Sequence, residues 1–194
     1  MSPLSDVQYS RFTETEFCKF LTFRSGGLLE ALIPMTDDER VDVETHLKEH
    51  FGQSLAIQVK AAHVLYRHGG VWRLQKRFWV KRNRIVNDEF FFYFFGYMGI
   101  AEMTFRAPVF LVPSHVVHTQ AVHRRVGNIV YFNFVASMSP DSHDKWRPYA
   151  MDPNDVAARV IAFLRSHRRG MQGLTVAGPR LPSPGTVWVG RAAA

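Results

Sequence analysis

The sequence predicts a single α/β domain in which a mixed central β-sheet is flanked by helices. Its 194 residues suit one compact domain. A composition of 46% hydrophobic and 21% charged residues is typical of a globular protein with a real core. Segments with the 3.6-residue period of helices and the two-residue period of strands both occur. We expect the domain to cover residues 1–170 and a Gly/Pro-rich tail to follow over residues 171–194.

The first predicted element is a helix over Thr13–Phe23. Apolar residues around Phe17 recur there with the spacing of one helical face. Thr13, with Glu16 three residues later, has the pattern of a capping box. The pair Gly26-Gly27 is expected to end the helix.

Three short strands are predicted next, over Leu28–Ile33, Val41–Thr45 and Leu55–Ala61. The second alternates apolar and polar residues and is rich in β-branched side chains, which favour strands. On the third, the same alternation places Gln58 and Lys60 side by side on one face. These three strands carry the residues of chemical interest.

The remaining elements are predicted from turns and apolar runs. Strand-like segments flank the glycine pair after His68, which indicates a hairpin. Phe90–Tyr97 reads as a strand buried on both faces. Two further strands are predicted over Val109–Val112 and Gly127–Ala136. Two further helices are predicted over His115–Arg124 and Asp155–Arg169.

Cysteine content and hydropathy exclude several classes of protein. Cys18 is the single cysteine, so an intrachain disulfide and a cysteine-based zinc cage are both excluded, as suits a reducing cytoplasm. The most apolar stretch, Phe90–Ile100, is much shorter than the roughly 20 residues that a membrane helix needs. The first ten residues lack the basic start and apolar run of a signal peptide. We therefore expect a cytoplasmic protein with no membrane partner.

Charge is distributed unevenly along the chain. Residues 1–60 carry a net charge of −4, and residues 61–194 carry +11. An acidic segment suits divalent cations, and a basic segment interleaved with aromatic residues suits a phosphate backbone. The candidate nucleic-acid-binding residues are the seven basic side chains of one segment without acids: Arg67, Arg73, Lys76, Arg77, Lys81, Arg82 and Arg84. The alternative is a hairpin whose solvated face happens to be basic.

Asp42, Gln58 and Lys60 form the constellation that points to chemistry. If the strands over residues 41–45 and 55–61 are neighbours, these three side chains converge near one sheet end. Phosphodiester cleavage needs such a set, because a divalent cation activates water and neutralises phosphate, and an ammonium group stabilises the transition state. The alternative is that Asp42 caps a turn beside Arg40 and that Gln58 and Lys60 are ordinary sheet neighbours.

The spacing of these residues resembles a known family. Asp42, followed sixteen positions later by Gln58-Val59-Lys60, resembles the signature of the PD-(D/E)xK nuclease superfamily, and the glutamine variant is similar to Mrr-type restriction endonucleases. The resemblance covers residues 12–62 and departs from the family where Gln58 replaces an acidic ligand and Val41 replaces proline.

The resemblance implies a restriction-endonuclease-like fold and a site for Mg²⁺ or Mn²⁺. Asp42, Gln58 and the Val59 carbonyl would hold the metal, with Glu16 of the preceding helix as a further ligand and Glu14 as the less favoured choice. The implied catalytic residues are Asp42, Gln58, Lys60 and Glu16.

The function expected is Mg²⁺-dependent hydrolysis of phosphodiester bonds, most simply in DNA. The glutamine at a ligand position keeps open a catalytically silent module that binds nucleic acid. A subunit of a larger defence or repair complex also stays open, as does a homodimer.

Three other candidates are assigned structural roles. His46 and His50 are four residues apart, but a strand followed by a loop breaks the geometry of a helical zinc site. Cys18 is expected to be a buried structural thiol. Trp146 is expected to anchor its loop on the core, with Asp144 paired locally.

Overall fold

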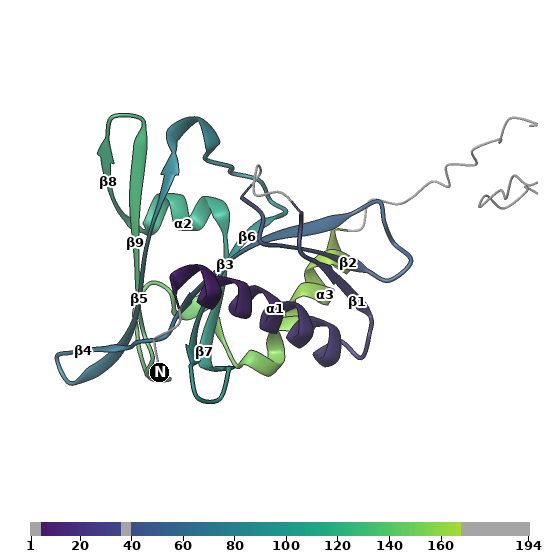
Figure 1. Ribbon diagram of the computed structural model, residues 1–194, viewed down its shortest axis with the longest axis horizontal. Helices are drawn as coiled ribbons and strands as arrows, with labels where there is room; N and C mark the ends of the chain where they lie inside the picture. Colours follow the sequence, from purple (N-terminus) through teal and green to yellow (C-terminus); the bar gives the residue numbers. More distant parts are fainter. Residues whose placement is uncertain (1–4, 36–39, 168–194) are drawn as a thin grey trace, which may run out of the picture.

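The computed structural model describes residues 5–35 and 40–167, which form three layers (Figure 1). Helices α1 (Asp6–Arg24) and α3 (Val156–Ser166) cover one face of a six-stranded sheet. A four-stranded sheet and helix α2 (Ser114–Gln120) cover the other face. The predicted tail over residues 171–194 lies outside the described residues.

The six-stranded sheet is mixed, as predicted. Its order is β1-β2-β3-β6-β7-β10, in which β3 and β6 are parallel and every other neighbouring pair is antiparallel. The strands are β1 (Leu29–Leu32), β2 (Val43–Leu47), β3 (Ser54–Ala62), β6 (Phe91–Gly99), β7 (Thr104–Pro113) and β10 (Ala150–Met151). The expectation of a single α/β domain with a mixed central sheet and flanking helices is confirmed.

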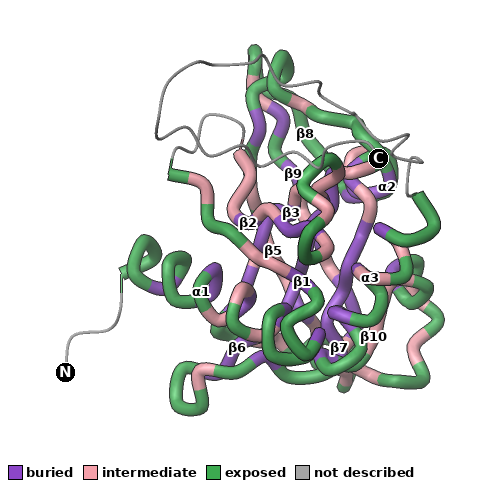
Figure 2. The backbone as a smooth tube through the Cα atoms, turned by 90° about the vertical axis from the view of Figure 1, so that its right-hand side faces the viewer, coloured by how far each residue is buried: buried purple, intermediate pink, exposed green. Residues whose placement is uncertain are grey.

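Strand β6 is the centre of both cores. Alternate residues of a strand point to opposite faces, so Phe92 and Phe94 pack against α1 and α3. Phe91, Tyr93 and Phe95 pack against the four-stranded sheet. The prediction of a strand buried on both faces is therefore confirmed, and the tube in Figure 2 is mostly buried along this part of the chain.

The four-stranded sheet has the order β4-β5-β9-β8, and all its neighbouring pairs are antiparallel. Its strands are β4 (Tyr66–His68), β5 (Val71–Lys81), β9 (Ile129–Ser137) and β8 (Val122–Val126). The hairpin of β4 and β5 was predicted. The second sheet as a whole was not.

Strand β8 corrects the predicted helix over His115–Arg124. Helix α2 ends at Gln120, and the next residues pair with β9 around Gly127, whose φ of +57° suits a tight hairpin turn. The strand begins and ends with the β-branched residues Val122 and Val126, which favour a strand paired with β9 over a longer helix.

Helix α1 begins earlier than predicted. Ser5 is its N-cap, and Ser5 and Gln8 exchange hydrogen bonds in a capping box, so the proposed box of Thr13 and Glu16 is wrong. The Thr13 hydroxyl instead donates to the Ser10 carbonyl inside the helix. The predicted end is confirmed, because two glycines with positive φ follow the C-cap.

Aromatic packing joins the two sheets. The Phe134 ring of β9 lies 3.7 Å from the Phe95 ring of β6, nearly parallel to it, and 4.6 Å from the Trp146 ring. Trp146 is buried, and its loop is held by Asp144, which accepts bonds from the backbone N–H groups of Ser137 and Trp146. The predicted anchoring role of this loop is confirmed.

The short helical turns and α3 complete the chain. Single 3₁₀ turns lie at Arg82–Arg84, Arg147–Tyr149 and Pro153–Asp155. Asp152 caps the last of these through the N–H of Asn154, just before α3. The predicted helix is therefore confirmed, but it ends at Ser166, and the predicted end at Arg169 lies outside the described residues. In the described part of the chain, none of the helices has the length and apolar character needed to span a membrane.

Candidate functional site

The candidate site is a polar pocket of about 330 Å³ between α1, the end of β1 and the middle of β3. Its charged and amide-bearing lining residues are Arg11, Glu14, Arg40, Asp42, Gln58 and Lys60. A larger pocket of about 730 Å³ shares Arg40 with it, and a smaller one of about 250 Å³ shares Lys60. Three adjoining pockets thus run along the surface past Asp42.

Asp42 is held in place by the neighbouring strand β3. It lies just before β2, and its backbone N–H donates to the Ile57 carbonyl at 3.1 Å. One carboxylate oxygen accepts from the Gln58 side-chain amide at 3.0 Å, and the other accepts from the Val59 backbone N–H at 2.8 Å. The predicted convergence of Asp42 with Gln58 is confirmed as geometry, and it follows from the antiparallel pairing of β2 with β3.

Lys60 completes this cluster. Its Nζ lies 3.7 Å from the Asp42 Oδ2, and both side chains are largely shielded from water. Burial raises the pKa of Asp42, as does the nearby charge of Glu14. The Lys60 ammonium and the bonds from Val59 and Gln58 oppose that rise without cancelling it. The carboxylate of Asp42 is therefore a desolvated group, in a pocket whose lining carries two acids and the three cations Arg11, Arg40 and Lys60.

Helix α1 brings Glu14 to the pocket and not Glu16. Glu14 is 8% exposed and lines the pocket, where it accepts bonds from the Ser10 hydroxyl and the Arg11 guanidinium, each at 3.1 Å. Glu16 lies outside the pocket lining and pairs with Lys19 one turn later.

The helical period explains the difference between the two glutamates. At 100° per residue, Glu14 shares a face with the buried Phe17 and Leu21, whereas Glu16 lies nearly opposite. The placement expected for Glu16 is therefore corrected to Glu14, which the sequence had suggested as the less favoured choice.

The ligand atoms of the pocket suit Mg²⁺, which keeps part of its water shell, better than an ion that is coordinated by protein atoms alone. Within residues 5–35 and 40–167, no three His, Cys, Asp or Glu side chains gather in a way that could hold a metal. Asp42 and Glu14 supply two carboxylates, and Gln58 adds an amide. Mg²⁺ is usually held by one or two carboxylates and completes its coordination with water and phosphate oxygens, so these residues fit it. The Val59 N–H faces Asp42, and its carbonyl points to the same edge of β3.

The seven predicted phosphate-binding residues do not share one face. Lys76 points towards the six-stranded sheet and lines the small pocket with Lys60. Burial lowers the pKa of Lys76, and the charge of Lys60 lowers it further against the opposing effect of Asp6. Arg84 lines the large pocket. These two are the members of the set that the structure brings next to the candidate site.

The other five lie elsewhere on the four-stranded sheet and its margins. Arg67 stacks on the Trp72 ring at 6.0 Å, and Arg73 is half-buried on β5. Arg77 lines a pocket on the outward face of the sheet. Lys81 and Arg82 are exposed where β5 ends. Successive side chains of β5 point to opposite faces of the sheet, so the basic residues predicted to form one phosphate-binding surface are divided between two faces.

Arg40 is a candidate site residue that the sequence reasoning did not assign to the site. Its guanidinium donates to the Trp79 carbonyl at 2.7 Å and lies 5.6 Å from the centre of the Trp79 ring. It also lines both the Asp42 pocket and the large pocket. Its proximity to Asp42 in the sequence was the one available signal, because the contact with β5 spans 39 residues.

The surroundings of His46 and Cys18 indicate structural roles for both residues. His46 pairs with Glu30 across β1 and β2, with 3.0 Å between the His46 Nε2 and a Glu30 carboxylate oxygen. Cys18 is half-buried against the core, and burial raises the pKa of its thiol to about 11, which disfavours a nucleophilic thiolate.

Comparisons with known proteins give little support for any assignment. No family model matches the chain, and no curated protein matches it. Among solved structures, the bacterial homing endonuclease I-Ssp6803I is similar with a TM-score of 0.46 and 14% sequence identity, over 84% of this chain and 98% of that chain. At that TM-score the likeness carries no weight for fold or function, and the resemblance to the PD-(D/E)xK superfamily stays a prediction.

Proposed function

We propose that this protein hydrolyses phosphodiester bonds of DNA with Mg²⁺ or Mn²⁺ at the Asp42 pocket. The observation that carries the proposal is the meeting of two carboxylates, an amide and a lysine in one shielded pocket. Structural ion pairs usually join one acid to one base. Here burial raises the pKa of Asp42, and a second acid, Glu14, adds a smaller contribution, which is the kind of perturbation that marks functional sites.

Asp42, Glu14 and Gln58 would hold the metal in this proposal. Asp42 is oriented by the Val59 N–H, so little motion is needed for its carboxylate to act as a ligand. A bound Mg²⁺ would supply charge neutralisation at the phosphate and acidify the attacking water. Since a cation offsets the repulsion between Asp42 and Glu14, their proximity favours its binding.

Lys60 would stabilise the phosphate as charge develops on it. Its ammonium lies beside Asp42, in a partly desolvated position where electrostatic stabilisation is stronger than in water. Lys76 and Arg40 would hold flanking phosphates, because each lines a pocket that adjoins the Asp42 pocket or is part of it. Phosphate contacts of this kind position a duplex without reading its sequence.

The test is nicking of supercoiled plasmid by the full chain in Mg²⁺ or Mn²⁺. We expect metal-dependent nicking by the natural protein and at least about 100-fold slower nicking by Lys60→Ala, the typical cost of losing a transition-state stabiliser. Lys48→Ala is the matched control, because Lys48 is an exposed lysine in the turn between β2 and β3. Undiminished nicking by Lys60→Ala would overturn the site assignment.

A second candidate is a nucleic-acid-binding module that keeps the pocket and does not cut. The glutamine at a ligand position favours it, because Gln58 contributes no charge and already donates to Asp42. Calorimetric titration separates the two. DNA affinity that is the same with and without Mg²⁺, together with intact plasmid, would support the module over the nuclease.

A further inference from the structure

The outward face of the four-stranded sheet exposes an aromatic row that the Asp42 pocket does not use. Trp79 of β5, Tyr131 of β9 and Arg124 of β8 are cross-strand partners, so they form one row over three strands. Trp79 is 50% exposed and Tyr131 is 39% exposed. Large aromatic side chains on a sheet face are normally covered, so this pair is available to a partner.

Basic residues lie on two of these three strands: β5 carries four Lys or Arg residues and β8 carries two, whereas β9 carries none. Strands β5, β8 and β9 are described in full and contain no aspartate or glutamate. On the outward face, Arg77 and Lys81 flank Trp79 on β5, and Arg124 lies 5.7 Å from the centre of the Tyr131 ring. A face of this charge is complementary to a polyanion and repels other cations.

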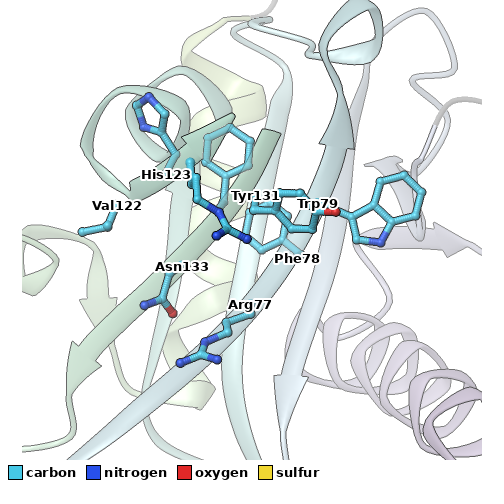
Figure 3. A pocket seen from close by; sticks show the side chains of 9 residues that line it. Arg77, Phe78, Trp79, Val122, His123, Tyr131 and Asn133 are labelled. Atoms are coloured by element: carbon cyan, nitrogen blue, oxygen red, sulfur yellow. The ribbon is translucent and has the colours of Figure 1, made fainter. Parts of the chain in front are cut away.

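A pocket of about 440 Å³ lies within this face, and Figure 3 shows its lining side chains. Its walls come from Arg77, Trp79, Tyr131, Asn133 and Val122 on three neighbouring strands. Asn133 accepts a hydrogen bond from the Gln75 amide at 2.9 Å, which orients its side chain on the sheet. A pocket with apolar and aromatic walls and a few polar groups suits a ligand with a flat, weakly polar ring.

We infer that this outward face binds unpaired nucleotides of the nucleic acid substrate, an inference that rests on the proposed function. Bases stack on Trp79 and Tyr131, and Arg77 and Arg124 contact the phosphates between them. A paired duplex presents phosphates to a flat surface and keeps its bases stacked inside, so exposed aromatic rings would add little to its binding. A single strand can place the face of each base on a ring.

Arg40 connects this face with the candidate active site. Its guanidinium lies over the Trp79 ring, and its side chain also lines the Asp42 pocket. Nucleotides stacked on Trp79 therefore lie next to the entrance of the pocket in which Asp42 and Lys60 meet. The protein would then act where duplex and single strand join or where a strand is free.

The experiment measures binding without cleavage. Fluorescence anisotropy of labelled oligothymidine, oligouridine and a blunt DNA duplex, with the full chain in EDTA, gives three dissociation constants. We expect Trp79→Leu and Tyr131→Leu each to weaken single-strand binding by about 5- to 150-fold, the range for loss of one base–aromatic stack. Duplex binding should change little.

Trp72→Leu is the matched control, because Trp72 is 53% exposed at the other end of β5 and belongs to no part of this row. Unchanged melting temperatures show that each variant is folded. Equal single-strand affinity of the natural protein and both variants would overturn the inference. So would self-association that Trp79→Leu abolishes, since a second copy would then occupy the face. Strand binding with no nicking under any condition would contradict the proposed function alone.

Discussion

The two sheets of this protein place their charges in opposite ways. The six-stranded sheet and α1 shield Asp42, Lys60 and Glu14 in a pocket, where desolvation raises the pKa of Asp42. The four-stranded sheet has no acid in its three long strands and exposes Trp79 with its basic side chains to solvent. One region shields its charges from water, and the other exposes basic and aromatic side chains to it.

The difference shows how one packed core can support both shielded and exposed charges. Buried charges cost free energy and need a rigid frame, which β3 supplies through its bonds to Asp42. Exposed arginines and aromatic rings cost little and need only a stable sheet beneath them. Phe95 and Phe134 stack between the sheets, so the two sheets share one packed layer.

The largest effect is expected at that shared layer. Phe134→Ala removes a fully buried ring that contacts Phe95 and Trp146, so it should lower the free energy of unfolding by about 3–5 kcal/mol. Phe23→Ala, at an exposed position on α1, should change it by less than about 0.5 kcal/mol. Urea unfolding followed by tryptophan fluorescence and circular dichroism measures both. Two separate transitions would break the comparison, because the sheets would then be independent units.

The next effect separates two neighbouring glutamates of α1. Glu14→Gln removes a carboxylate of the Asp42 pocket and should raise the Mg²⁺ concentration for half-maximal nicking by at least about tenfold. Glu16→Gln is the matched control and should leave it unchanged, because Glu16 pairs with Lys19 outside the pocket. If Glu16→Gln alone changed the Mg²⁺ concentration for half-maximal nicking, Glu16 and not Glu14 would be the metal ligand.

A smaller effect concerns the stability cost of the buried acid. The pKa of Asp42 is raised in the folded chain, so the native state binds this proton more tightly than the unfolded state. Its contribution therefore favours folding below the unfolded pKa of about 3.9 and is lost as pH rises through the raised native pKa.

Asp42→Asn should consequently raise the Tm by about 2–4 °C at pH 8, equivalent to about 1 kcal/mol, and by less near pH 4. Thermal unfolding at both pH values without metal measures this. An Asp42→Asn protein that is less stable than the natural one at pH 8 would show that the bonds to Gln58 and Val59 outweigh the cost of the charge.

The smallest effect is electrostatic and belongs to the outward face. Arg77→Gln should reduce the slope of log affinity against log salt concentration by about 1 for single-stranded DNA, as expected for one lost phosphate contact. Arg147→Gln, at an exposed position on a 3₁₀ turn that contributes nothing to the lining of this pocket, is the control. Anisotropy titrations between 50 and 200 mM salt, the range over which such slopes are usually resolved, give the slope. An unchanged slope would show that Arg77 does not contact a phosphate of the bound strand.

Much of the six-stranded sheet could be predicted from local sequence. The strands that became β1, β2, β3 and β6 each carry a clear apolar or alternating pattern, and the glycines after α1 mark its end. The second sheet could not be predicted in the same way. Its main pairing joins β5 to β9, from Lys81 with Ile129 to Arg73 with Ser137, which are far apart in the sequence. Strand β8 has no local pattern strong enough to distinguish it from a continuation of α2.

The site was predicted in part for a similar reason. Asp42, Gln58 and Lys60 converge because adjacent strands pair, which a strand pattern implies directly. Glu14 could have been predicted, because it lies on the same helical face as Phe17. The apparent capping pattern of Thr13 and Glu16 favoured Glu16 instead. Arg40 had no such signal, because its position depends on the distant strand β5.

The most direct test of the central claim is the position of Mn²⁺ in crystals of the full chain, found by its anomalous scattering. The account predicts one strong peak between the Asp42 and Glu14 carboxylates, near the Gln58 amide, which is absent from crystals of Asp42→Asn. A pocket without Mn²⁺, at a concentration that supports nicking in solution, would contradict the account.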